Sequence, residues 1–210
     1  MINVLLSTYD FSNEHCYPKL KNILRPNMNT IILPFAHSEE YYENEELFND
    51  LYDYETGKDY NIICNEFRQY GIEKSNVYTL NPFRDSLEYM KYKISKAEVI
   101  FGVGGNPITF MKMLKKLEIL EDVKAFNGIF IGASASAMVQ LEEFMTYYLP
   151  WEHYPYRYFK GLGYVKGVDV VVHWNKNRWQ YIAKIISYIQ RKIPFLPLED
   201  GFCMIFDEND

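Results

Sequence analysis

Ser134 lies in a run of small residues, at a point where a strand-forming segment gives way to a helix-forming one. Residues Gly128–Ile131 are rich in β-branched and aromatic side chains, which predicts a buried strand, and a helix is expected from Ala135 to about Gln140. A serine in so sharp a turn projects its hydroxyl beside the free N–H groups of the helix N-terminus. The segment is therefore typical of a nucleophile elbow. The alternative is an ordinary βα turn in which Ser134 caps the helix.

The pattern Gly132-x-Ser134-x-Ser136 departs from the usual G-x-S-x-G of such elbows only at its last position. Gly132 sets the turn and Ser134 is at its apex, so Ser134 is the predicted nucleophile. Ser136 is expected in the first helical turn, pointing away from the site. On that basis, replacing Ser136 with glycine should preserve or raise turnover.

A serine nucleophile needs a base, and His173 is the predicted one. It ends the apolar run Val168–Val172, which is a predicted strand, and ligands of α/β sheets bind beyond the carboxyl ends of the strands. The alternative is a structural histidine at a strand end. The other histidines fall in loops or beside acidic stretches: His15, His37 and His153.

A second glycine turn, residues 102–107, follows the predicted strand Val99–Gly102 and opens a predicted helix at Pro107. It resembles a phosphate-binding loop, but it lacks the lysine of a P-loop and the third glycine of a dinucleotide fingerprint. Beside a serine elbow, its N–H groups are better interpreted as oxyanion donors. The predicted pair of donors is Gly105 and Ala135.

Strand and helix patterns alternate along the whole chain, which predicts parallel strands joined by crossover helices. The fold class expected is α/β, a three-layer sandwich with a mostly parallel central sheet, in one domain over residues 1–210. The predicted strands are Asn3–Leu6, Thr30–Phe35, Val77–Leu80, Val99–Gly102, Gly128–Ile131, Val168–His173, Phe195–Leu198 and Phe202–Phe206. The predicted helices are Tyr60–Tyr70, Ser86–Ser95, Pro107–Leu117 and Arg178–Gln190. Two stretches do not follow this alternation of strands and helices, Glu39–Asp59 and Glu142–Lys160.

Composition narrows the functional classes. A net charge of −6 argues against nucleic acid as a partner, and no apolar run is long enough to span a membrane. The three cysteines show neither metal-ligand spacing nor a disulfide framework, which predicts a reducing, cytoplasmic location. No signal peptide is expected, because the first residues lack a basic start and a long apolar region.

Several motifs together are similar to those of a known family. Gly104-Gly105-Asn106 with Thr109-Phe110, the elbow, His173 followed by an aromatic, Arg178, Leu198–Gly201 and Pro34-Phe35-Ala36 occur in the order seen in dipeptidase E. The chain resembles that family of α-aspartyl dipeptidases, relatives of cyanophycinase on the class I glutamine-amidotransferase-like, flavodoxin-like fold. This resemblance extends over nearly the whole chain.

The resemblance implies site residues. Ser134 matches the nucleophile, His173 the general base, and Gly105 with Ala135 the oxyanion donors. Arg178 would bind the aspartyl carboxylate of the substrate, and Asn106 would be a further substrate-binding residue. The orienting acid would be Glu152, by its spacing from the elbow, with Glu142 and Glu143 expected earlier, on the elbow helix.

The function expected from the resemblance is hydrolysis of small peptides through an acyl-enzyme on Ser134, without a metal or organic cofactor. The preferred substrate would be a dipeptide with an N-terminal aspartyl residue. Two alternatives are left open: a related hydrolase acting on another short peptide or a cyanophycin-like substrate, and a non-enzymatic member that binds without turnover. The expected partner is the peptide substrate, and a homodimer is left open.

Overall fold

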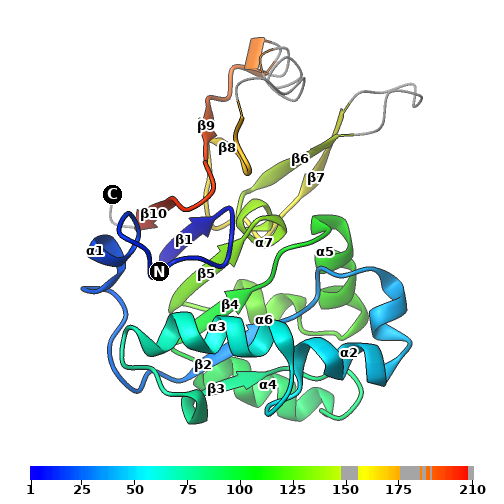
Figure 1. Cartoon of the computed structure of the whole chain (residues 1–210). Helices are drawn as coiled ribbons and strands as arrows, with labels where there is room; N and C mark the ends of the chain where they lie inside the picture. Colours follow the sequence, from blue (N-terminus) through cyan, green and yellow to red (C-terminus); the bar gives the residue numbers. More distant parts are fainter. Residues whose placement is uncertain (148–155, 176–184, 186–187, 190, 208–210) are drawn as a thin grey trace.

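The central sheet runs through the middle of the molecule in the computed structural model, which describes residues 1–147, 156–175, 185, 188, 189 and 191–207 (Figure 1). Within those residues this sheet has six strands, in the order β10-β1-β5-β4-β2-β3. Their bounds are Cys203–Asp207, Ile2–Leu6, Ile129–Ala133, Val99–Gly102, Thr30–Leu33 and Val77–Thr79. All neighbours are parallel except β10, which is antiparallel to β1. The predicted mostly parallel sheet is confirmed.

Helices cover both faces of this sheet, as a three-layer sandwich requires. Helix α3 lies over the near face in Figure 1, and α4 and α6 lie behind it. The helices are α1 (Tyr17–Leu20), α2 (Glu45–Tyr52), α3 (Lys58–Arg68), α4 (Leu87–Lys96), α5 (Pro107–Lys116), α6 (Leu120–Lys124) and α7 (Ala135–Val139), with 3-10 turns η1 (Glu39–Tyr42) and η2 (Lys74–Asn76). Strands β2, β4 and β5 are buried at every residue, which explains why they are continuous apolar runs rather than alternating ones.

Two smaller two-stranded sheets project from the carboxyl edge of the central sheet (Figure 1). Strands β6 (Glu143–Tyr147) and β7 (Tyr156–Lys160) are antiparallel, and β8 (Asp169–Val171) and β9 (Phe195–Pro197) are parallel. The expectation that Glu142 and Glu143 belong to the elbow helix is wrong, because α7 ends at Val139 and Glu143 begins β6. The predicted helix Arg178–Gln190 lies mostly outside the described residues.

Neighbouring parallel strands bring their carboxyl ends to one edge of the central sheet. In register, Leu6 of β1 lies opposite Ala133 of β5, and Gly102 of β4 lies opposite both Gly132 of β5 and Leu33 of β2. The turns that follow β1, β2, β4 and β5 therefore meet. Among the described residues, no helix is long and apolar enough to cross a membrane.

Candidate active site

Ser134 occupies a strained turn between β5 and α7. Its φ of 50° and ψ of −105° are unusual for a residue with a side chain, and strain of this kind is typical of functional turns. The Ser134 N–H donates to the carbonyl oxygen of Leu6 at 2.8 Å, which fixes the turn against β1. A Cβ on Gly132 would lie 2.3 Å from the carbonyl oxygen of Ser136, so only glycine fits before the turn. The Ser134 side chain makes no capping bond, contrary to the helix-cap alternative.

The hydroxyl of Ser134 instead faces His173. Ser134 Oγ lies 3.0 Å from His173 Nε2, so the structure brings together the predicted nucleophile and base. His173 also has a positive φ, 53°, and its N–H donates to Ser7 Oγ at 3.0 Å. Ser7 follows β1, is fully buried, and donates its own proton to the carbonyl oxygen of Leu198 at 2.7 Å. Strand β8, which precedes His173, pairs with β9 rather than with the central sheet. The hydrogen bond to Ser7 nevertheless fixes His173 at the carboxyl edge of β1.

Asp200 holds the other ring nitrogen of His173. The distance between His173 Nδ1 and Asp200 Oδ1 is 2.7 Å. Asp200 belongs to the turn before β10, in which Gly201 has a φ of 79°. Asn13 Nδ2 donates to the carbonyl oxygen of Gly201 at 2.9 Å and to that of Asp10 at 2.7 Å, so the turn is fastened to the loop after β1.

The orienting acid was predicted to be Glu152, which lies outside the described residues. In the structure the position beside His173 Nδ1 belongs to Asp200 rather than to Glu142 or Glu143, and Glu143 pairs with Arg191. The sequence contained a signal for Asp200, because this residue is part of the Leu198–Gly201 motif that supports the family resemblance. The sequence alone gives that motif no catalytic role.

The two predicted oxyanion donors adjoin Ser134 in sequence or through the neighbouring glycine turn: Ala135 follows it directly, and Gly105 follows Gly104, which packs against it. A Cβ on Gly104 would be 3.4 Å from Ser134 Cβ, so the glycine turn packs directly against the nucleophile. Gly105 has a φ of 138°, and a Cβ there would lie 2.2 Å from the carbonyl oxygen of Ala36. Ala135 is the first residue of α7, where an N–H lacks an intrahelical partner. Within the described chain no acceptor is bonded to the N–H of Gly105 or Ala135, so both can serve an oxyanion.

Two predicted substrate-binding residues have different outcomes. Asn106 is exposed and caps α5, its Oδ1 accepting from Ile108 N at 2.8 Å and from Thr109 N at 3.3 Å. Its carbonyl group is therefore engaged in the fold, and its amide nitrogen is the group left for a ligand. Arg178 lies outside the described residues.

The arrangement has the parts needed for acyl transfer. With the Nδ1 proton donated to Asp200, Nε2 is free to accept the proton of Ser134; this tautomer follows from the hydrogen-bond network. The side chains of His173 and Asp200 are 39% and 62% exposed, so water reaches this pair. Their electrostatic interaction is correspondingly weaker than in a buried triad.

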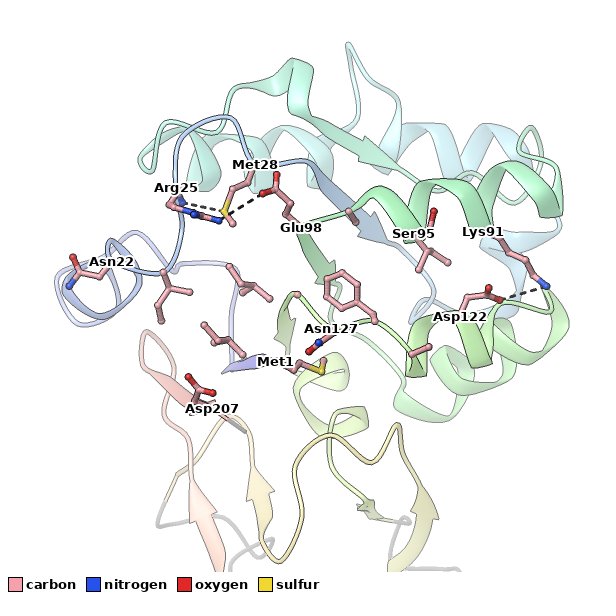
Figure 2. A pocket seen from close by; sticks show the side chains of 18 residues that line it. Met1, Asn22, Arg25, Met28, Lys91, Ser95, Glu98, Asp122, Asn127 and Asp207 are labelled. Atoms are coloured by element: carbon pink, nitrogen blue, oxygen red, sulfur yellow. Dashed lines mark hydrogen bonds and ion pairs between the residues drawn. The ribbon is translucent and has the colours of Figure 1, made fainter. Parts of the chain in front are cut away.

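A cavity of about 880 Å³ lies elsewhere, at the amino ends of β1, β4 and β5 (Figure 2). Its rim charges pair with one another: Arg25 lies 3.9 Å from Glu98, and Lys91 lies 3.7 Å from Asp122. It is therefore separate from the chemistry around Ser134. Among the described residues, no group of three or more His, Cys, Asp or Glu side chains is arranged to hold a metal ion.

The chain is similar to known peptidases in a family model and in fold. The model of peptidase family S51 matches residues 5–210. A crystal structure of a candidate peptidase E protein from Listeria monocytogenes EGD-e is similar with a TM-score of 0.62 and 17% identity, over 100% of this chain and 95% of that one. A peptidase from an acI-B1 Actinobacterium is similar with a TM-score of 0.62 and 15% identity, over 98% of this chain and 82% of that one. No curated protein matches the chain by sequence.

Proposed function

The chain belongs to peptidase family S51 and is a serine peptidase, and we propose that it hydrolyses dipeptides with an N-terminal aspartyl residue. The observation that carries the catalytic part of this proposal is the line of contacts from Ser134 Oγ to His173 Nε2 at 3.0 Å and from His173 Nδ1 to Asp200 at 2.7 Å. We assign Ser134 as nucleophile, His173 as general base and Asp200 as the acid that orients the imidazole.

In the first step His173 Nε2 takes the proton of Ser134 as Oγ attacks the carbonyl carbon of the peptide bond. Negative charge builds on the carbonyl oxygen, where the N–H groups of Gly105 and Ala135 stabilise it. Asp200 accepts a hydrogen bond from the Nδ1–H and stabilises the imidazolium that forms. His173 then protonates the leaving amine, and water, deprotonated by the same nitrogen, releases the acyl group from Ser134.

The preference for an aspartyl residue is the finer part of the proposal and depends on Arg178. A guanidinium suits bidentate binding of a carboxylate, and the family resemblance assigns an arginine at this position to that task.

All three cysteines are free thiols, which supports the expected cytoplasmic location.

The test is turnover of Asp-Xaa dipeptides by the purified protein, with products quantified by mass spectrometry. Matched Ala-Xaa and Asn-Xaa dipeptides and a cyanophycin-like polymer are the comparison substrates. Hydrolysis of Asp-Xaa at least tenfold faster than of Asn-Xaa, abolished in Ser134→Ala, is the expected result. Faster cleavage of the cyanophycin-like polymer would instead favour a cyanophycinase-like specificity. Equal rates on Ala-Xaa and Asp-Xaa would refute the acidic preference while leaving the peptidase assignment intact.

A further inference from the structure

The peptide group between Val103 and Gly104 is held at both ends by side-chain hydroxyls. Its carbonyl oxygen accepts a hydrogen bond from Ser136 Oγ, and its N–H donates to the hydroxyl of Tyr9 at 3.1 Å. Ser136 is fully buried in the first turn of α7, and Tyr9 lies in the loop after β1. Two elements far apart in the sequence thus clamp one peptide group of the glycine turn.

This clamp matters because the residues after it have no side chains to restrain them. Gly104 and Gly105 are free to rotate about their backbone bonds in a way that other residues are not. The next fixed point is the N–H of Asn106, which donates to the carbonyl oxygen of Ala36 at 2.6 Å. The clamp and this bond lie on either side of the Gly105 N–H and together determine where it points.

The Tyr9 hydroxyl also borders a partly buried polar cluster that contains Tyr52 and Asp59. In this cluster the Tyr52 hydroxyl contacts Asp59 Oδ2 at 3.4 Å and the Nε2 of His37. Because the Gly104 N–H donates to the Tyr9 oxygen, a lone pair of Tyr9 faces the glycine turn.

The ring of Tyr9 is also fixed in place. It packs edge-on against Phe101 of β4, with ring centroids 5.6 Å apart and an interplanar angle of 75°. A Cβ on Gly104 would lie 3.8 Å from its Cε1, so the ring borders the same glycine turn that packs against Ser134. Replacing tyrosine with phenylalanine would therefore remove the hydroxyl while the ring keeps its contacts.

We propose that Tyr9 and Ser136 are positioning residues that hold the Val103–Gly104 peptide group so that the Gly105 N–H faces the developing oxyanion. This inference rests on the proposed function and adds two residues to it. It also reverses the expectation for Ser136. The serine that replaces the usual elbow glycine points away from the site, as predicted, but its hydroxyl supports the oxyanion turn. Ser136→Gly should therefore lower turnover rather than preserve it.

The kinetic test compares Tyr9→Phe, Ser136→Ala and the double variant with the wild type on the best peptide substrate. A donor displaced by a fraction of an ångström is worth about tenfold in rate, so each single variant should lose about tenfold or more in kcat with KM within about twofold. Because both hydroxyls hold one peptide group, the double variant should lose less than the product of the single losses. Affinity for a peptidyl trifluoromethyl ketone, which forms a tetrahedral oxyanion, should fall in parallel with kcat.

The matched control is Tyr164→Phe, which removes another largely buried tyrosine hydroxyl that bonds the backbone, in this case by donating to the carbonyl oxygen of Val123. It should change thermal stability by a similar amount without changing kcat. A fall in kcat in Tyr164→Phe equal to that in Tyr9→Phe would show a general effect of lost stability and overturn the proposal. Additive losses in the double variant, together with unchanged affinity for the ketone, would also overturn the proposal.

A second readout needs no activity. In Tyr9→Phe, the Gly104 amide should exchange its hydrogen faster and the Gly105 amide resonance should shift, and neither change should occur in Tyr164→Phe. Unchanged Gly104 and Gly105 amides would overturn the clamp whatever the kinetics show. If those amides respond as expected but the wild type hydrolyses no peptide, the proposed function fails and the catalytic part of this inference with it. Full kcat in Tyr9→Phe, with Ser134→Ala inactive, would overturn the inference alone.

Discussion

Replacing Asp200 with asparagine tests the assignment that sequence reasoning missed. Asparagine keeps the size of the side chain and can still present its carbonyl oxygen to His173 Nδ1, because the amide can turn its NH2 group toward water at this exposed position. The substitution therefore removes the negative charge and spares the tautomer that leaves Nε2 free for Ser134. What is lost is stabilisation of the imidazolium that forms during attack.

The size of this loss follows from the exposure of the pair. Two unit charges about 4 Å apart interact by about 1 kcal/mol in water and by about 4 kcal/mol at an effective dielectric constant of about 20. With side chains 39% and 62% exposed, His173 and Asp200 fall between these limits. At about 1.4 kcal/mol for each factor of ten, Asp200→Asn should lower kcat by between about 5-fold and about 10³-fold. This is less than the roughly 10⁴-fold loss in triads where the acid is buried.

The assay is steady-state hydrolysis of the best dipeptide across the pH range, with Glu199→Gln as the matched control. Glu199 is an exposed acid on the same turn, so its removal changes the net charge equally without touching His173. The control should keep kcat within about twofold. If Asp200→Asn also stays within twofold, the contact at 2.7 Å has no catalytic role. If Glu152→Gln instead causes the loss, the original assignment of Glu152 is correct.

Three further outcomes are expected. Gly105→Ala should abolish turnover and lower the free energy of unfolding by at least about 1–3 kcal/mol, measured with denaturant. The reason is that the new Cβ would lie 2.2 Å from the carbonyl oxygen of Ala36, at a φ of 138°. A wild-type kcat in this variant would exclude Gly105 as an oxyanion donor. Burial lowers the pKa of His37, so the unfolded chain binds a proton more readily and stability should fall as pH drops through about 6.5. The melting temperature of His37→Gln should fall less steeply between pH 7.5 and 5.5, and parallel curves would contradict this. Arg178→Met should raise the activation free energy obtained from kcat/KM by about 2–5 kcal/mol more for aspartyl dipeptides than for neutral ones. Equal losses on both would show that Arg178 does not bind the aspartyl carboxylate.

Local sequence determined the fold class and indicated the two residues that we propose react, Ser134 and His173. The elbow at Ser134 depends on small residues within a few positions of it, and the end of an apolar run places His173 at the carboxyl end of a strand. The glycine turn at Gly105 is visible in the same way. Periods and turns are short-range properties, so a sequence displays them directly.

The partners of these residues were decided only in three dimensions. Asp200 reaches His173 because the turn before β10 is fastened by Asn13 to the loop after β1, and no spacing in the sequence expresses that contact. Likewise, the sequence shows Ser136 only as a replacement for the usual elbow glycine. The structure shows that its hydroxyl bonds the Val103 carbonyl oxygen, in the same peptide group whose N–H donates to Tyr9. A hydroxyl or carboxylate can bond any group that the fold brings within about 3 Å, so its role depends on how distant strands are paired rather than on its neighbours in the chain.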